Sequence, residues 1–98
     1  MALLDSPLIK AMLDENLLIE KQMHDAYSRL MNEGDQADAA IVSELLEKNA
    51  KIREAVYAND QEGAIGATEA CHRIIDQYPS LFDRIESWYE TGPLAFPT

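Results

Sequence analysis

Glu69 and His72 form the pair of residues in this chain that most resembles a metal-ligating motif. They spell Glu-x-x-His, the spacing at which one helix of a bundle supplies two ligands to a di-iron centre. Such a centre needs a second pair, and the nearest candidate, Glu20 with His24, is separated by one residue too many. Glu69 and His72 also lie opposite the apolar stripe of their predicted helix. The spacing favours a solvated pair between His72 and Asp76, and we expect no metal and no other cofactor.

Cys71 is the single cysteine and therefore the obvious candidate nucleophile. A thiol nucleophile needs a general base within hydrogen-bond reach, whereas the adjacent His72 points about 100° away around a helix. Cys71 lies on the apolar face, where we expect a small core residue. The sequence also lacks a glycine-rich phosphate loop, a serine nucleophile motif and His-Glu-x-x-His. We expect no catalytic residue and no enzyme activity.

Polar residues interrupt the predicted apolar faces at four positions, Asn16 and Glu20 in one helix and Asn49 and Arg53 in the next. If the two helices pair about Gly34, residues whose numbers add up to about 69 lie level, as do Asn16 with Arg53 and Glu20 with Asn49. The four should form one polar layer. The favoured role is a hydrogen-bonded layer that fixes register or oligomeric state. The alternatives are a small-ligand or peptide pocket around Arg53 and Glu20, or a layer that is simply exposed.

The elements that position these residues follow from the spacing of apolar residues. Apolar side chains recur every three or four positions, which is typical of amphipathic helices, and no strand-like alternation competes. Ser6 with Pro7 starts the first helix, Gly34 ends it, and Asp35 caps the second. The pattern predicts helices over about 7–32, 36–58, 60–78 and 81–91.

The later helix boundaries carry capping patterns. Asn59 with Glu62 forms a capping box at the start of the third helix, and Pro79 ends that helix. Ser80 with Asp83 repeats the capping pattern before the fourth. Because the connections are short, neighbouring helices must be antiparallel.

The expected fold is therefore all-α, an up-and-down antiparallel bundle of two long and two shorter helices. It forms one domain over 1–98, with a short apolar tail at 93–98. Part of the long pair should extend beyond the short pair and expose apolar surface that suits a second copy of the chain.

Small residues gather in the third predicted helix. The run from Asn59 through Ala67, with Cys71, resembles the junction and second helix of a tetratricopeptide repeat. That resemblance implies a helical solenoid, which needs about three repeats, and this chain carries no second one. The small residues more simply indicate close helix contact, at a cost in helix propensity at Gly63 and Gly66.

Composition limits the classes of partner. The 98 residues are 47% hydrophobic and carry a net charge of −10, which repels nucleic acid and anionic lipid unless a basic patch is present, and we find none. No stretch approaches the roughly 18 apolar residues of a membrane span. The N-terminus lacks a basic segment typical of a signal peptide, and a lone cysteine fits a reducing compartment. We expect a cytoplasmic protein.

These features predict a small acidic protein-interaction module, an adaptor, chaperone or inhibitor that binds a protein partner and forms a homodimer. One form of this hypothesis is an inhibitor that masks a basic nucleic-acid-binding surface. The predicted partner-binding residues are aromatic and acidic residues near the C-terminus, namely Trp88, Tyr89, Phe96, Glu86 and Glu90. The alternatives are a self-assembling structural subunit or a metal- or small-ligand-binding bundle that uses Glu20, His24, Arg53, Glu69 or His72.

Overall fold

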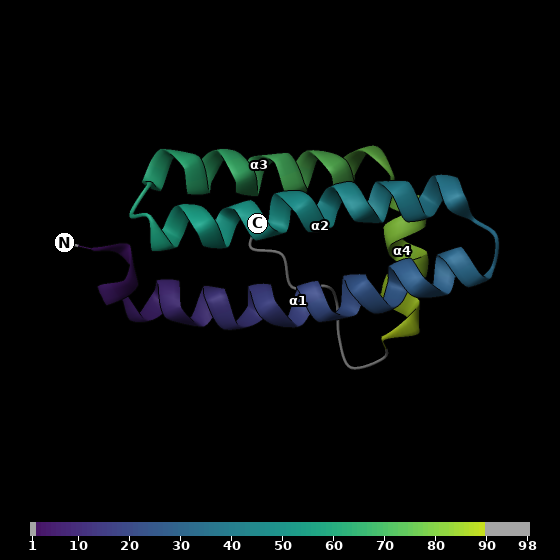
Figure 1. Ribbon diagram of the computed structural model, residues 1–98, viewed down its shortest axis with the longest axis horizontal. Coiled ribbons are helices and arrows are strands. Elements are labelled where there is room, and N and C mark those ends of the chain that lie inside the picture. Colours follow the sequence, from purple (N-terminus) through teal and green to yellow (C-terminus); the bar gives the residue numbers. More distant parts are fainter. Residues whose placement is uncertain (1, 90–98) are drawn as a thin grey trace.

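The computed structural model describes residues 2–89 and folds them into four α-helices (Figure 1). They are α1 (Pro7–Asn32), α2 (Gln36–Tyr57), α3 (Gln61–Gln77) and α4 (Pro79–Trp88), preceded by a short 3-10 turn, η1 (Leu3–Asp5). No strand occurs between residues 2 and 89. The predicted all-α bundle of four helices is confirmed.

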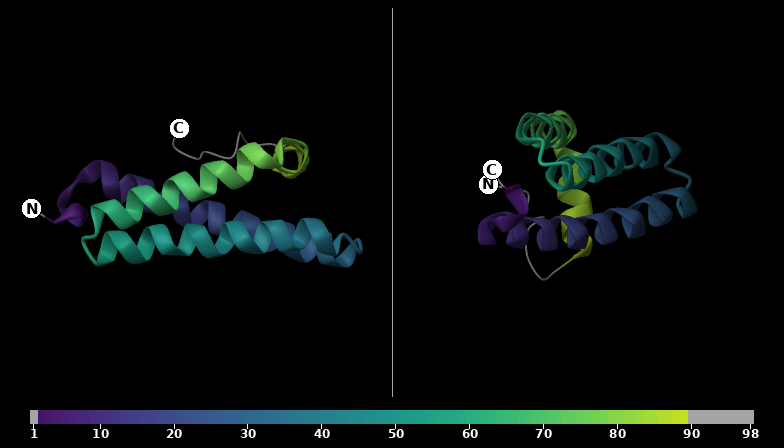
Figure 2. Two further views of the ribbon diagram at one scale, coloured as in Figure 1. Left: turned by 90° about the horizontal axis from the view of Figure 1, so that it is seen from above. Right: turned by 60° about the vertical axis from the view of Figure 1, so that its left-hand side comes forward.

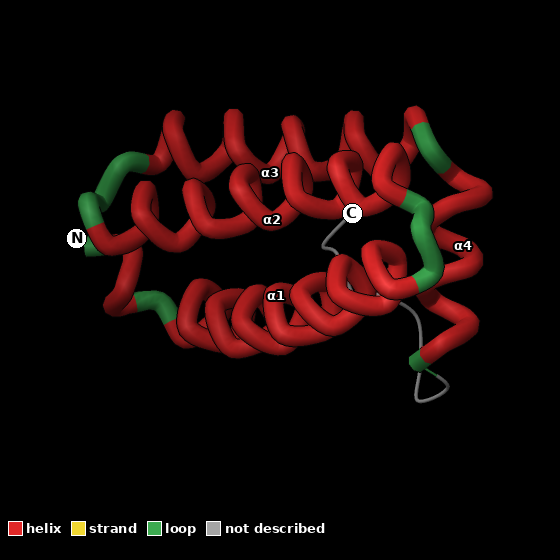
Figure 3. Tube along the Cα trace, turned by 45° about the vertical axis from the view of Figure 1, so that its right-hand side comes forward, coloured by secondary structure: helices red, strands yellow, loops and turns green. Residues whose placement is uncertain are grey.

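The helices α1, α2 and α3 run alternately up and down, with α2 packed against both neighbours (Figures 1 and 2). The fourth helix lies crosswise to these three, and the view from above in Figure 2 looks along its axis. Only Tyr78 separates α3 from α4, so there is no loop long enough to reverse the chain into a fourth antiparallel position. Figure 3 shows that the other connections are short as well.

The first helix begins and ends as the sequence indicates. The Ser6 hydroxyl accepts a hydrogen bond from the Ile9 amide at 3.4 Å, and Pro7 occupies the first turn of α1. Gly34 has a φ of 82°, a left-handed conformation that glycine adopts without strain. Asp35 is the N-cap of α2 but makes no side-chain cap bond, because its carboxylate accepts from Arg84 at 3.1 Å instead.

The cap of α3 differs from the prediction by one residue. Asp60 rather than Asn59 is the N-cap, and its carboxylate accepts from the Gly63 amide at 2.9 Å. Asn59 has a φ of 56°, a left-handed conformation that Asn tolerates better than most residues. Its side-chain oxygen accepts from the Leu3 amide at 2.8 Å, so it ties η1 to the turn between α2 and α3.

The start of α4 also differs. The prediction placed its cap at Ser80, whereas α4 begins at Pro79 with Tyr78 as its N-cap and no side-chain cap bond. Proline has a fixed φ that suits the first helical turn and lacks the amide that would go unpaired there. Pro79 therefore ends α3 and also starts α4.

The core draws on all four helices and includes Cys71, which is fully buried as predicted. Several large apolar side chains remain outside it. Leu8, Leu17 and Leu18 are 78%, 48% and 56% exposed, and all three lie in the N-terminal half of α1, away from α4 (Figure 1). The long helix therefore exposes apolar surface as expected. Over residues 2–89, none of the helices combines the length and apolarity that crossing a bilayer requires.

Candidate functional site: a groove between α2 and α3

The four predicted polar-layer residues meet between α1 and α2, as their register indicates. Asn16 and Asn49 are buried and exchange side-chain hydrogen bonds, with Nδ2 of Asn16 2.9 Å from Oδ1 of Asn49 and Nδ2 of Asn49 3.2 Å from Oδ1 of Asn16. Each amide also donates to the main-chain oxygen of the other residue. The side-chain nitrogen and the side-chain oxygen of both asparagines therefore have hydrogen-bond partners.

Arg53 completes the layer from the solvent side. Its Nη1 donates to Oδ1 of Asn16 and its Nη2 to Oε1 of Glu20, both at 2.8 Å. The Arg53 and Glu20 side chains are 18% and 22% exposed. Because these groups bond to one another, the arrangement favours the structural role, a layer that fixes the register of α1 against α2, over a ligand pocket.

Trp88 and Tyr89 hold α4 against α1. The guanidinium carbon of Arg29 lies 4.0 Å from the centre of the Trp88 ring, a cation–π contact. The Tyr89 hydroxyl lies 2.8 Å from both the Gln22 carbonyl oxygen and the Asp25 carboxylate, to which it donates. Burial and the Asp25 carboxylate raise the pKa of Tyr89. These two aromatic residues thus have an internal role.

The partner-binding assignment at the C-terminus stays a prediction. Glu86 is half-buried on α4, whereas Glu90 and Phe96 lie outside the described residues.

The candidate metal and nucleophile residues lie in different surroundings from those that their spacing in the sequence suggested. Burial raises the pKa of the Cys71 thiol to about 11, an effect that Lys48 only partly offsets. His72 is not the solvated partner of Asp76 that its spacing indicated. It is half-buried, and its Nε2 is enclosed without a hydrogen bond to any described residue, because the contact face of α3 extends past Cys71 to Thr68, His72 and Ile75. Within residues 2–89, no three His, Cys, Asp or Glu side chains are grouped to hold a metal ion.

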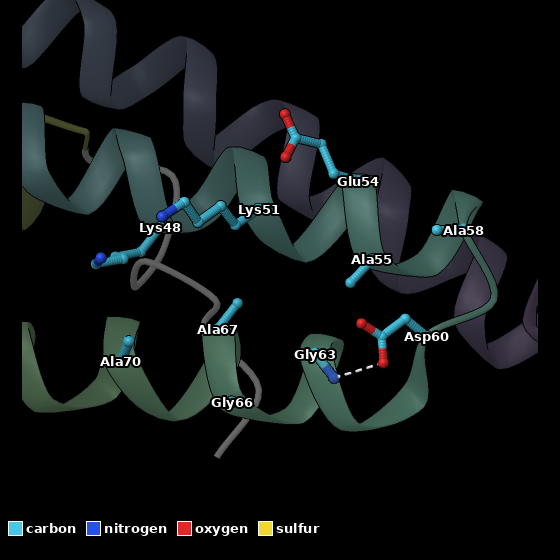
Figure 4. A pocket seen from close by; sticks show the side chains of 10 residues that line it. All are labelled: Lys48, Lys51, Glu54, Ala55, Ala58, Asp60, Gly63, Gly66, Ala67 and Ala70. Carbon is cyan, nitrogen blue, oxygen red and sulfur yellow. Dashed lines mark hydrogen bonds between the residues drawn. The ribbon is translucent and has the colours of Figure 1, made fainter.

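An open groove of about 530 Å³ runs between α2 and α3. Figure 4 shows its lining of small side chains, with Lys48 and Ala70 toward one end and Asp60 and Gly63 toward the other. The lining residues are Lys48, Lys51, Glu54, Ala55, Ala58, Asp60, Gly63, Gly66, Ala67 and Ala70. The sequence interpretation linked small residues to close helix contact and missed that several of them line an open surface.

The two glycines of the groove have different explanations. A Cβ at Gly63 would overlap the Asp60 carboxylate and lie 2.8 Å from its Cγ, so the α3 cap requires glycine there. A Cβ at Gly66 would meet no atom within 4 Å. Glycine weakens a helix interior by roughly 0.5–1 kcal/mol relative to alanine, and no contact within the described residues explains that cost at Gly66.

A second, smaller hollow of about 430 Å³ lies beside the turn from α3 to α4. It is lined by Asp38, Gln77, Tyr78, Pro79, Ser80, Leu81 and Arg84. The tight turn at Tyr78 accounts for it, because the two helices diverge there.

Comparison of the chain with models of protein families, with curated proteins and with solved structures found no match.

Proposed function

We propose that this chain is a protein-interaction module that binds a protein partner through the groove between α2 and α3. The observation that carries the proposal is Gly66, an exposed glycine inside a helix with open space where a side chain would lie. A glycine that weakens its helix without serving the internal packing is expected where another backbone must approach closely.

The chemistry of the groove supports binding rather than catalysis. Ala55, Ala67 and Ala70 give it a half-buried apolar floor, and the charged groups stand along its α2 edge and at the end that Asp60 occupies (Figure 4). None of the ten lining residues is a cysteine, histidine, serine or threonine, so the groove offers no thiol or hydroxyl nucleophile and no imidazole base. Small side chains on a helix surface allow a second helix to pack at the short end of the usual interaxial range.

The test compares proteins captured from a cell lysate by the wild-type chain and by Gly66→Leu. Leucine at Gly66 fills open space, so it should block the groove and leave the fold intact, as circular dichroism would verify. Gln61→Leu is the matched control, because Gln61 is an exposed position of α3 outside the groove lining. Partners held by the wild type and Gln61→Leu but lost by Gly66→Leu support the proposal. Equal capture by all three proteins would contradict it.

A further inference from the structure

We infer that the protein docked in this groove is a second copy of the chain, which contributes its own α3 in the antiparallel direction. This inference rests on the proposed function, since it names the occupant of the same groove.

Small residues occupy the centre of the groove-facing side of α3. Gly63, Gly66 and Ala70 are spaced by three and four residues and therefore lie on one side of the helix. A two-fold axis midway between Gly66 and Ala70 places Gly66 of one copy opposite Ala70 of the other. The smallest side chains then face each other where the two helices approach most closely. This close approach would explain why position 66 is a glycine with open space beside it.

Charges flank this small centre with opposite signs. Glu62 precedes Gly66 by four residues and Arg73 follows Ala70 by three, and both side chains are exposed. Arg73 forms no ion pair within residues 2–89. In the antiparallel arrangement Arg73 of each copy lies opposite Gly63 and Glu62 of the other. In a parallel arrangement Arg73 of one copy would lie level with Arg73 of the other and far from its Glu62, so the opposite charges can pair only in the antiparallel direction.

The α2 edge of the groove also carries opposite charges toward its two ends. Lys48 and Lys51 lie toward the α4 end, whereas Glu54 lies toward the turn between α2 and α3 (Figure 4). Reversing the direction of the second copy brings its Glu54 toward these lysines. The same patch is thus complementary to itself, as the interface of a two-fold dimer must be.

Local complementarity matters because the chain as a whole repels itself. Each copy carries a net charge of −10, which opposes non-specific self-association. An interface between two copies must therefore place opposite charges across from each other, and Arg73, Lys48 and Lys51 supply three of the eight basic residues of the chain.

Sedimentation equilibrium of the full-length chain over a wide concentration range at physiological salt tests the inference. We expect a reversible dimer for the wild type and for Gln61→Leu. Gly66→Leu should weaken association at least about tenfold, because a larger side chain separates the two helices. Its helix content should not fall, since leucine is a better helix former than glycine.

A charge exchange gives a second and independent test. Arg73→Glu alone and Glu62→Arg alone should each weaken the dimer, because each places like charges opposite one another. The double variant Arg73→Glu with Glu62→Arg has the wild-type net charge and should restore association. A wild type that is monomeric throughout, or a dimer that neither Gly66→Leu nor the charge variants weaken, would overturn the inference. If the purified chain is monomeric but captures another protein in a manner sensitive to Gly66→Leu, the inference is wrong and the proposed function stands.

Discussion

At the scale of single residues, the polar layer shows how buried amides can be accommodated in a helical hairpin. Asn16 and Asn49 satisfy each other, and Arg53 bonds to Asn16 and Glu20. This grouping could be predicted because polar residues inside an apolar stripe are conspicuous and the short turn at Gly34 fixes which of them lie level. The hydrogen-bond pairing could not be predicted, since it depends on side-chain rotamers.

Replacing one asparagine of the layer should lower the free energy of unfolding by more than half of the loss that replacing both asparagines causes. Asn16→Leu leaves the Asn49 amide and one Arg53 donor without their partner, and we expect a loss of about 1–3 kcal/mol in the free energy of unfolding. In Asn16→Leu with Asn49→Leu, the combined loss should be smaller than the sum of the single losses by about 1 kcal/mol. Urea unfolding of Asn16→Leu, of Asn49→Leu and of the double variant measures this coupling. Strictly additive losses would mean that the two amides do not depend on each other.

Cys71 should make the stability of the fold sensitive to alkaline pH. Burial raises its pKa from 9.0 to about 11, so above pH 9 the unfolded chain loses the thiol proton before the folded chain does. The stability from this group is complete below pH 9 and is lost as the pH rises from 9 through 11. The raised pKa of Tyr89 acts in the same direction.

The measurement is urea unfolding as a function of pH. The free energy of unfolding should fall between pH 9 and 11, and the fall should be shallower in Cys71→Ala. Tyr89→Phe serves as a comparison, because it removes the contribution of the Tyr89 hydroxyl to this pH dependence. An identical slope in the wild type and Cys71→Ala would show that the thiol is not shielded from water.

At the level of the helices, α4 is held in its crosswise position by its last residue, Trp88, and by Tyr89, which follows it. The Tyr89 hydroxyl bonds to Gln22 and Asp25 on α1, so Tyr89→Phe should lower the free energy of unfolding by about 0.5–1.5 kcal/mol. Trp88 is the only tryptophan, and its fluorescence reports the docking of α4 directly. Tyr57→Phe is the control, since Tyr57 is 61% exposed and its change should stay within about 0.5 kcal/mol. Equal effects of the two changes would contradict the role assigned to Tyr89.

The two glycines of α3 should respond differently to alanine. Gly66→Ala gains helix propensity without meeting another atom, so we expect it to stabilise the dilute, monomeric chain by about 0.5–1 kcal/mol. Gly63→Ala gains the same propensity but displaces the Asp60 carboxylate, and losing that cap costs about 1 kcal/mol. The net effect of Gly63→Ala on the free energy of unfolding should therefore be near zero or destabilising. Thermal unfolding at low protein concentration compares the two, and a larger gain at Gly63 would contradict this account.

At the scale of the whole molecule, the sequence predicted the helices and the core better than the arrangement of α4. Apolar periodicity and short turns define α1, α2 and α3 within about one residue of each boundary. The crosswise course of α4 depends on whether Pro79 only ends one helix or also begins the next, and the local sequence allows both. The groove could not be predicted either, because small residues indicate close helix packing whether they face another helix or solvent. Only the three-dimensional structure shows that Gly66 faces open space.

If the groove between α2 and α3 is a protein-docking surface, as we claim, site-specific photo-crosslinking should trap the docked protein there. A photoreactive amino acid replaces Glu54, which is exposed at the groove edge, or Asp14, which is exposed on α1. Mixing isotope-labelled and unlabelled chains identifies adducts between copies by mass spectrometry. We predict protein adducts from position 54, predominantly to α2 and α3 of a second copy, that Gly66→Leu suppresses, and few from position 14. Equal yields from both positions, or adducts at position 54 that Gly66→Leu does not reduce, would contradict the claim.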